Sequence, residues 1–237
     1  MPDPKRLLLF VEGEGDVEAV PVLVNRLLHE LNPWDCLFLD KEPFRVHGVE
    51  NLTGPKTAEN WTRFLSAASR RAKLGGVLLL LDGDRETLPT VDGTVRPFCA
   101  KQVAQELAHG ARAVGGGLKF SVAVVFARQE YESWLMAGVN SLAGKPLPEG
   151  RAGVRAGTTP PDGDLELAPR DAKRWLGRHM EAGYKPSLDQ RGLTELVDLA
   201  SIRASRPRSF RRLENAISQL VRAIRTGSHM VSPETKS

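Results

Sequence analysis

The chain has 237 residues, of which 41% are hydrophobic and 26% are charged, enough apolar material to bury the core of a folded protein. No apolar run approaches the roughly 20 residues that cross a bilayer, and acidic residues follow the first apolar run too soon for a signal peptide. We therefore expect a cytoplasmic protein that does not enter a membrane. The two cysteines favour neither a disulfide framework nor a zinc site, and a net charge of +4 indicates a partner only if it is concentrated.

The first apolar run is RLLLFV at 6–11, which is continuous rather than alternating and predicts a fully buried strand ending at Glu12. From Asp16 the apolar residues recur at helical spacing until Asn32 and Pro33 interrupt them. The chain therefore begins with a strand, a short acidic loop and a helix. Weaker patterns predict strands at 36–39 and 45–47 and an amphipathic helix at 57–71.

The clearest run in the chain is VLLLLDGD at 77–84, which predicts a second buried strand ending on Asp82 and Asp84. A helix is expected at 99–109, a glycine turn at 115–117, and a third strand at 119–127. Buried strands that alternate with helices predict an α/β fold, with a mostly parallel sheet covered by helices on both faces.

Beyond Asn140 the composition changes. Residues 143–170 are rich in Gly, Pro and charged residues and predict a mobile loop, and helical patterns follow at 171–180, 193–202 and 209–224. We therefore expect an α/β domain over 1–140, and over 141–237 a mobile loop and helical region packed on it. The helical part is where we expect a homodimer or partner interface.

All three predicted strands end in acidic residues: Glu12 after the first, Asp82 and Asp84 at the end of the second, and Glu130 and Glu132 after the third. Loops at the carboxyl ends of parallel strands meet along one edge of the sheet. Carboxylates without His or Cys suit Mg²⁺, or Mn²⁺, better than Zn²⁺. Because Asp82 and Asp84 are two residues apart, we expect them on the same side of the chain and within reach of one cation.

Each of these residues also has a plainer interpretation. Asp16 is equally suited to capping the helix that follows it. Of Glu130 and Glu132, we expect one to point inward and the other outward. The segment DGDRET is also similar to the phosphatase signature DxDxT, but Glu86 stands where that signature has threonine, and the interpretation leaves Glu12 unused.

The order FVEGEGD, helix, LLLLDGD resembles the Toprim arrangement shared by topoisomerases, bacterial primases and OLD-family nucleases. FVEGEGDVEAVPVLVNRLL, EYESWL, YKPSLDQ and SRPRSFRRL further resemble an uncharacterised Toprim-like bacterial family suspected in defence against mobile DNA, over nearly the whole chain. The resemblance implies that Glu12 is a metal ligand or the general acid/base and that Asp82 and Asp84 are metal ligands. It also makes Asp16 a match to a second acidic position of OLD-type nucleases, and Glu130 and Glu132 candidates for a second metal site.

The activity implied is that of a Mg²⁺-dependent nuclease acting on DNA or RNA, as the effector of an antiviral defence system. The sequence has no GxxxxGK[ST] loop, so a partner ATPase is expected to be a separate chain. The alternative is a non-catalytic Toprim-fold module that binds nucleic acid or a partner. Ser187 or Asp189 is expected to orient phosphates, and the residues expected to hold flanking phosphates are Lys185, Arg203, Arg206, Arg208, Arg211 and Arg212.

Overall fold

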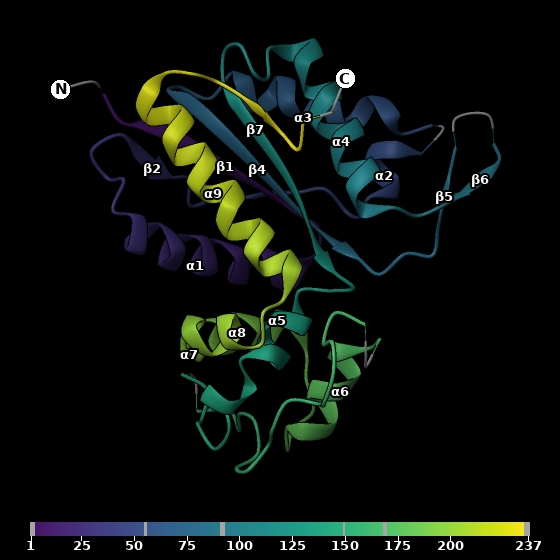
Figure 1. Ribbon diagram of the computed structural model, residues 1–237, viewed down its shortest axis with the longest axis vertical. Helices are drawn as coiled ribbons and strands as arrows, with labels where there is room; N and C mark the ends of the chain where they lie inside the picture. The colour runs from purple at the N-terminus through teal and green to yellow at the C-terminus, as the bar shows by residue number, and fades with distance from the viewer. Residues whose placement is uncertain (1–2, 55, 91–92, 149, 168–169, 235–237) are drawn as a thin grey trace.

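A parallel sheet forms the central layer of the molecule (Figure 1). The computed structural model describes residues 3–54, 56–90, 93–148, 150–167 and 170–234. Within them six strands run in the order β2-β1-β4-β7-β8, with β3 also beside β1, and every pairing in this sheet is parallel. Their bounds are β1 (Lys5–Val11), β2 (Leu37–Leu39), β3 (Phe44–Arg45), β4 (Leu74–Gly83), β7 (Ser121–Arg128) and β8 (Val231–Ser232).

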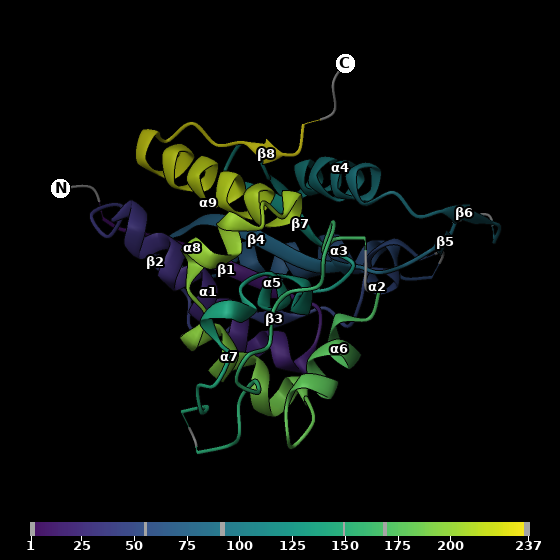
Figure 2. The same ribbon diagram turned by 60° about the horizontal axis from the view of Figure 1, so that its bottom comes forward.

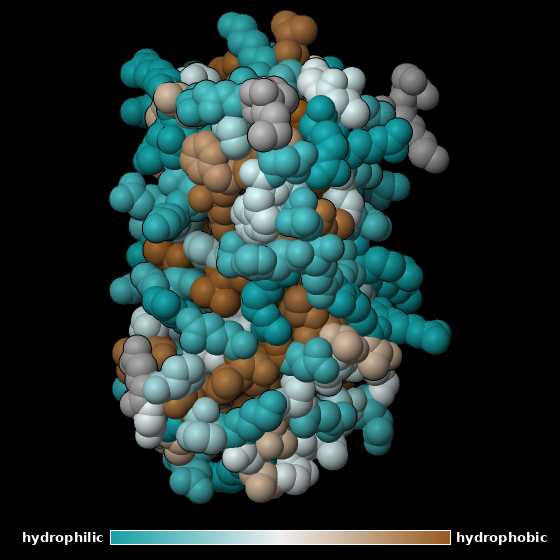
Figure 3. Space-filling model, turned by 90° about the vertical axis from the view of Figure 1, so that its left-hand side faces the viewer, coloured by the Kyte–Doolittle hydropathy of each residue, from teal (hydrophilic) through white to brown (hydrophobic). Residues whose placement is uncertain are grey.

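Helices cover both faces of the sheet. On one face Leu7 and Leu9 of β1 share a buried core with α1 (Glu14–Leu31) and α9 (Arg208–Thr226). On the other face Leu8 and Phe10 pack with α3 (Ala58–Ser69) and α4 (Ala100–Gly110). The expected α/β fold is confirmed, and burial on both faces explains why the central strands are continuous apolar runs. On the side of the molecule seen in Figure 3, hydrophobic residues lie mostly in recesses between hydrophilic side chains.

A group of short helices lies at the carboxyl end of the sheet (Figure 2). It contains α5 (Glu132–Ala137), α6 (Ala172–His179), α7 (Arg191–Leu196) and α8 (Leu199–Ala204). A 3-10 turn, η2 (Val139–Ser141), follows α5, and a π-helical turn, η3 (Pro186–Gln190), precedes α7, while the 3-10 turn η1 (Ala111–Val114) follows α4 outside this group. The chain then returns to the sheet through α9 and β8. No helix of the described ranges is long and apolar enough to cross a membrane.

The prediction of a single helix at 193–202 is wrong, because the chain is extended at Val197 and forms two helices, α7 and α8. The side chain of Asp198 accepts from the amide of Ala200 and caps the start of α8. The sequence did not predict several small elements, among them α2 (Glu50–Thr53), α5, β8 and the hairpin of β5 (Thr87–Pro89) and β6 (Val95–Pro97).

The segment expected to be a loop has neither helix nor strand in its described part, 143–148, 150–167 and 170; residues 149 and 168–169 lie outside the described residues. It is nevertheless anchored, since Leu147, Val154 and Leu165 are buried in the same core as α1 and α9.

Candidate metal and nucleic-acid site

Acidic side chains gather at the carboxyl ends of β1, β4 and β7. We call Glu12, Asp16, Asp82, Glu130 and Glu132 the acidic cluster. One lysine from α6 lies among them: the Nζ of Lys173 is 3.1 Å from Glu130, 3.4 Å from Asp82 and 3.7 Å from Glu132. Three strand ends and a helix far along the chain therefore meet at one point.

Hydrogen bonds from the backbone hold these carboxylates. Oε2 of Glu12 accepts from the amide of Asp82 at 2.9 Å, and Oδ1 of Asp82 accepts from the amide of Tyr131 at 2.9 Å. These two bonds tie the end of β1 to β4 and the end of β4 to the segment after β7. Oε1 of Glu130 accepts from the amide of Lys173 in the first turn of α6, at 2.7 Å, where the helix dipole favours a negative charge.

The cluster is more buried than its cation. The side chains of Glu132, Glu130 and Asp82 are 1%, 7% and 13% exposed, whereas that of Lys173 is 40% exposed. Burial raises the pKa of Asp82 well above its usual range, with Lys173 opposing the shift, and burial raises the pKa of Glu132 to about 7. Burial alone would lower the pKa of Lys173, but the charges of Glu132, Asp82 and Glu130 raise it overall.

Asp84 lies apart from Asp82. It is 48% exposed, and its nearest cation is Arg85, with 3.8 Å between Asp84 Oδ1 and Nε. The pKa of Glu12 is raised by burial first and then by the charges of Asp16 and Asp84, so Asp84 still acts on the cluster electrostatically. The two aspartates thus differ in environment: Asp82 contacts Lys173, and Asp84 stands at the rim.

Asp16 has both oxygens engaged. Oδ2 accepts from the amide of Gly13 at 2.8 Å, at the start of α1, and Oδ1 accepts from Nε2 of Gln190 at 2.7 Å. Asp16 is therefore not the N-cap residue, because α1 begins at Glu14; it lies in the first turn and caps the helix from within, through the amide of Gly13. Gly15 also fits this junction, since a Cβ there would lie 2.1 Å from Oε1 of Gln190 and 2.8 Å from Pro186.

The expectation that Glu130 and Glu132 would point to opposite sides is wrong, since both are buried. The chain turns directly from β7 into α5, and α6 packs against α5, so the two side chains are enclosed together. Oε1 of Glu132 accepts from the hydroxyl of Tyr184 at 2.8 Å, while its buried Oε2 has no hydrogen-bond partner among the described residues. That oxygen is an acceptor without a donor, 3.7 Å from the ammonium of Lys173.

The donor chemistry of the cluster fits a hard divalent cation such as Mg²⁺ or Mn²⁺, because it offers only carboxylate oxygens and one buried oxygen is unsatisfied. The cluster also holds five carboxylates, and the ammonium of Lys173 contacts three of them. In the described part of the chain, however, no three His, Cys, Asp or Glu side chains have the geometry of a formed metal site. Lys173 lies between the carboxylates, so an ion held by Asp82, Glu132 and Glu12 would require this lysine to withdraw.

Lys173 was missed by the sequence analysis. It stands 91 residues from Asp82 in the chain, and no motif marks it. The local signal is Asp171, whose side chain accepts from the amide of Arg174 at 2.8 Å and starts α6, which places Lys173 in the first turn.

The expected phosphate-binding residues separate into different environments. Lys185 and Ser187 are exposed. Asp189 is wholly buried, and it accepts from Nε of Arg151 at 2.8 Å and from the amide of Lys185 at 2.7 Å. Asp189 therefore holds the fold together and does not face a phosphate.

The arginines of the C-terminal region are also divided. Arg203 pairs with Glu30 and Glu214, the latter at 2.7 Å from Nε. Arg206 and Arg211 are exposed. Arg208 and Arg212 line a large cavity beside the acidic cluster.

Searches of curated proteins and of solved structures return no match to this chain. Residues 11–218 match the family model described as Domain of unknown function (DUF4276). The matched range contains the whole acidic cluster and Lys173. The chain therefore belongs to the DUF4276 family.

Proposed function

We propose that this chain is a divalent-metal-dependent nuclease whose centre is the acidic cluster. The observation that carries the proposal is the convergence of buried carboxylates from three strand ends with a single lysine, which leaves negative charge in excess and one oxygen of Glu132 unsatisfied. Excess buried negative charge is unfavourable unless a cation or a protonation offsets it. The Toprim resemblance of FVEGEGD and LLLLDGD supports the same proposal.

The residues have separate roles in this proposal. Asp82, Glu132 and Glu12 would hold the cation, which supplies Lewis-acid stabilisation of the extra charge on a phosphate under attack. As an alternative to the ligand role, Glu12 would transfer a proton, because burial raises its pKa above the usual range. Lys173 is 40% exposed, so its ammonium is able to turn from the carboxylates to a phosphate oxygen.

A second function, that of a non-catalytic binding module, is favoured by one specific observation. Lys173 already contacts three of the carboxylates, and among the described residues no formed metal site is present. An internal cation of this kind stabilises a fold without any metal ion. The two functions differ in whether a divalent ion binds at Asp82.

The cellular role that we propose follows from the resemblance of the sequence to the Toprim-like family. The nuclease would act in the cytoplasm, as the effector of a defence system against mobile DNA, together with a separate partner ATPase.

The test is to incubate the purified protein with plasmid, linear duplex, single-stranded DNA and tRNA in Mg²⁺ or Mn²⁺. We expect cleavage that requires the divalent ion and falls to background in Asp82→Asn. The control is Asp162→Asn, which removes the same charge from an exposed position outside the cluster. Cleavage that persists in Asp82→Asn or in EDTA would refute the proposal, and binding without cleavage would favour the module.

A further inference from the structure

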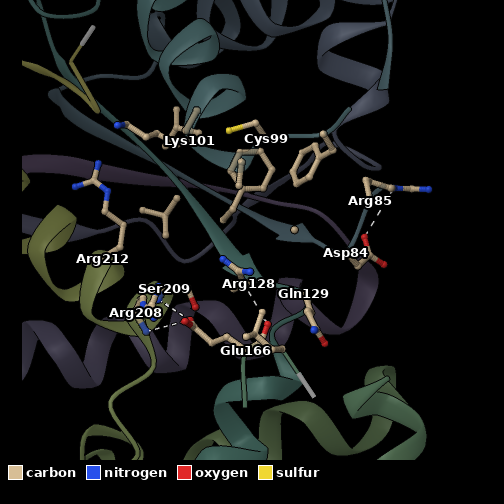
Figure 4. A pocket seen from close by; sticks show the side chains of 18 of the residues that line it. Asp84, Arg85, Cys99, Lys101, Arg128, Gln129, Glu166, Arg208, Ser209 and Arg212 are labelled. Atoms are coloured by element: carbon tan, nitrogen blue, oxygen red, sulfur yellow. Dashed lines mark hydrogen bonds and ion pairs between the residues drawn. The ribbon is translucent and has the colours of Figure 1, made fainter. Parts of the chain in front are cut away.

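A cavity of about 960 Å³ lies beside the acidic cluster, between α4 and α9 (Figure 4). Gly83 and Asp84 line one end of it, immediately after Asp82 in the chain. We call it the basic cavity, because its two acidic residues, Asp84 and Glu166, face six cations: Arg85, Lys101, Arg128, Arg170, Arg208 and Arg212.

The basic cavity follows the open edge of β7. Strand β8 pairs only with Val122 and Ala123, so within the described residues the rest of this edge has no neighbouring strand. Helices α4 and α9 pack on opposite faces of the sheet and form the two walls. The floor is apolar: Val124 and Phe126 line it, and the half-buried ring of Phe98 meets Phe126 edge-on, with 5.5 Å between centroids.

Four of the six cations form no ion pair with a described carboxylate. Arg85 pairs with Glu50 and Arg170 with Glu86, which leaves Lys101, Arg128, Arg208 and Arg212. Nε of Arg128 donates to the backbone oxygen of Glu166, at 3.3 Å.

The most informative cation is Arg212. It is half-buried, and its one side-chain bond in the described structure is to the hydroxyl of Ser232 at 2.8 Å. Burial lowers the pKa of Arg212, and no carboxylate of the described part of the chain offsets this shift. A guanidinium held in this way, without a carboxylate, is matched best by an anionic ligand.

Glu166 does not neutralise these cations. It is 2% exposed, and its carboxylate accepts from the amides of Arg208 and Ser209 at 2.9 and 2.6 Å, at the start of α9. This carboxylate is occupied by the helix terminus, where backbone donors have no partner inside the helix. The residues that line the cavity therefore carry a net positive charge on both sides of its apolar floor.

We propose that the basic cavity binds a single-stranded segment of nucleic acid and leads it past Asp84 to the acidic cluster; this rests on the proposed function for its class of substrate. Phosphates would lie against Lys101, Arg128 and Arg212, and unstacked bases would lie on Phe98. The volume is near the upper end of enclosed ligand sites, about 300–1,000 Å³, which suits a short run of nucleotides. A duplex keeps its bases stacked inside, so it would reach the rim but not the floor.

An extended peptide pairing with the open edge of β7 is the competing occupant. Such a strand would satisfy the backbone groups of β7, but it would leave the four unpaired cations unmatched. The two occupants are separated by the binding of an oligonucleotide.

The experiment measures fluorescence anisotropy of labelled oligonucleotides of about 12 residues, as single-stranded DNA, single-stranded RNA and duplex, in EDTA to prevent cleavage. We expect single strands of one or both chemistries to bind more tightly than the duplex. The double variant Lys101→Gln with Arg212→Gln should weaken this binding at least about tenfold and reduce the salt slope by about 1.4, or roughly 0.7 for each lost phosphate contact.

Arg222→Gln is the control, because it removes the same charge from another residue of α9, which is exposed and does not line the cavity. Its affinity should stay within about twofold of the unchanged protein, since a lone exposed charge acts only through screened electrostatics. Phe98→Leu keeps the wall apolar but removes the aromatic face, and it should weaken single-strand binding about tenfold with duplex binding unchanged.

Three results would overturn the inference: equal losses in Arg222→Gln and Arg212→Gln, a duplex that binds as tightly as a single strand, or no oligonucleotide binding at all. Because binding is measured in EDTA, it does not depend on cleavage. Binding of a single strand without Asp82-dependent cleavage would support the proposed role of the cavity and refute the proposed nuclease activity. Asp82-dependent cleavage without binding that depends on the cavity residues would support the nuclease activity and refute the role of the cavity.

Discussion

Replacing Lys173 with methionine removes the cation of the acidic cluster and keeps an unbranched apolar side chain in its place. The ammonium lies 3.1 Å from Glu130, 3.4 Å from Asp82 and 3.7 Å from Glu132. These are the ion pairs that the three carboxylates make with the described residues. Lys173→Met therefore leaves buried acids without a counter-charge.

The magnitude follows from how buried the partners are. Removing one member of a fully buried ion pair destabilises a protein by about 3–5 kcal/mol. The ammonium of Lys173 is 40% exposed, however, and water screens part of its interaction, so we expect about 2–3 kcal/mol. For a chain of this size that corresponds to a fall in Tm of about 4–12 °C in metal-free buffer.

The assay is thermal unfolding in EDTA, followed by titration with Mn²⁺ or Mg²⁺. If the lysine and a divalent ion compete for the same carboxylates, the ion should raise the Tm of Lys173→Met more than that of the unchanged protein. Lys185→Met is the control, since this exposed lysine forms no described ion pair, and it should change stability by no more than about 0.5 kcal/mol. A Tm unaltered by Lys173→Met, or equal gains from the ion in both proteins, would refute this reasoning.

Other predictions concern burial and helix ends. Burial raises the pKa of Glu132 from 4.5 to about 7 in the folded state. Between these two pH values the folded state binds more protons than the unfolded state, so the stability of the metal-free protein should fall as the pH rises. Denaturation midpoints measured against pH should fall less steeply in Glu132→Gln, and the same pH dependence in both proteins would contradict this prediction. Glu166→Ala leaves two amides of α9 without an acceptor and should lose about 2 kcal/mol in urea unfolding, with a smaller loss in Glu166→Gln; equal losses would count against the cap. Gly15→Ala places a Cβ 2.1 Å from Gln190 and should destabilise by about 1–3 kcal/mol. Gly177→Ala, whose nearest atom is 3.7 Å away, should be neutral or stabilising because alanine favours a helix, and similar losses in both would exclude the steric explanation.

The sheet was predictable from sequence because its central strands are buried on both faces. Continuous apolar runs at 6–11, 77–84 and 119–127 correspond to β1, β4 and β7, and parallel strands bring their carboxyl ends together. The convergence of Glu12 and Asp82 follows from that rule alone.

Contacts made by tertiary packing were not predictable. Lys173 reaches the cluster only because α6 packs on α5, and nothing in its own surroundings in the sequence records this. The arginines of 203–212 form one basic stretch in the sequence, but helix geometry divides them. Arg208 and Arg212 are four residues apart and share a face of α9 that lines the cavity, while Arg211 does not.

The most direct test of the central claim is anomalous diffraction from crystals soaked in Mn²⁺. We predict a peak at coordination distance from Asp82 and a carboxylate of Glu12 or Glu132, with the ammonium of Lys173 moved away from them. No peak at the acidic cluster, with Lys173 still in contact with Asp82, Glu130 and Glu132, would contradict it.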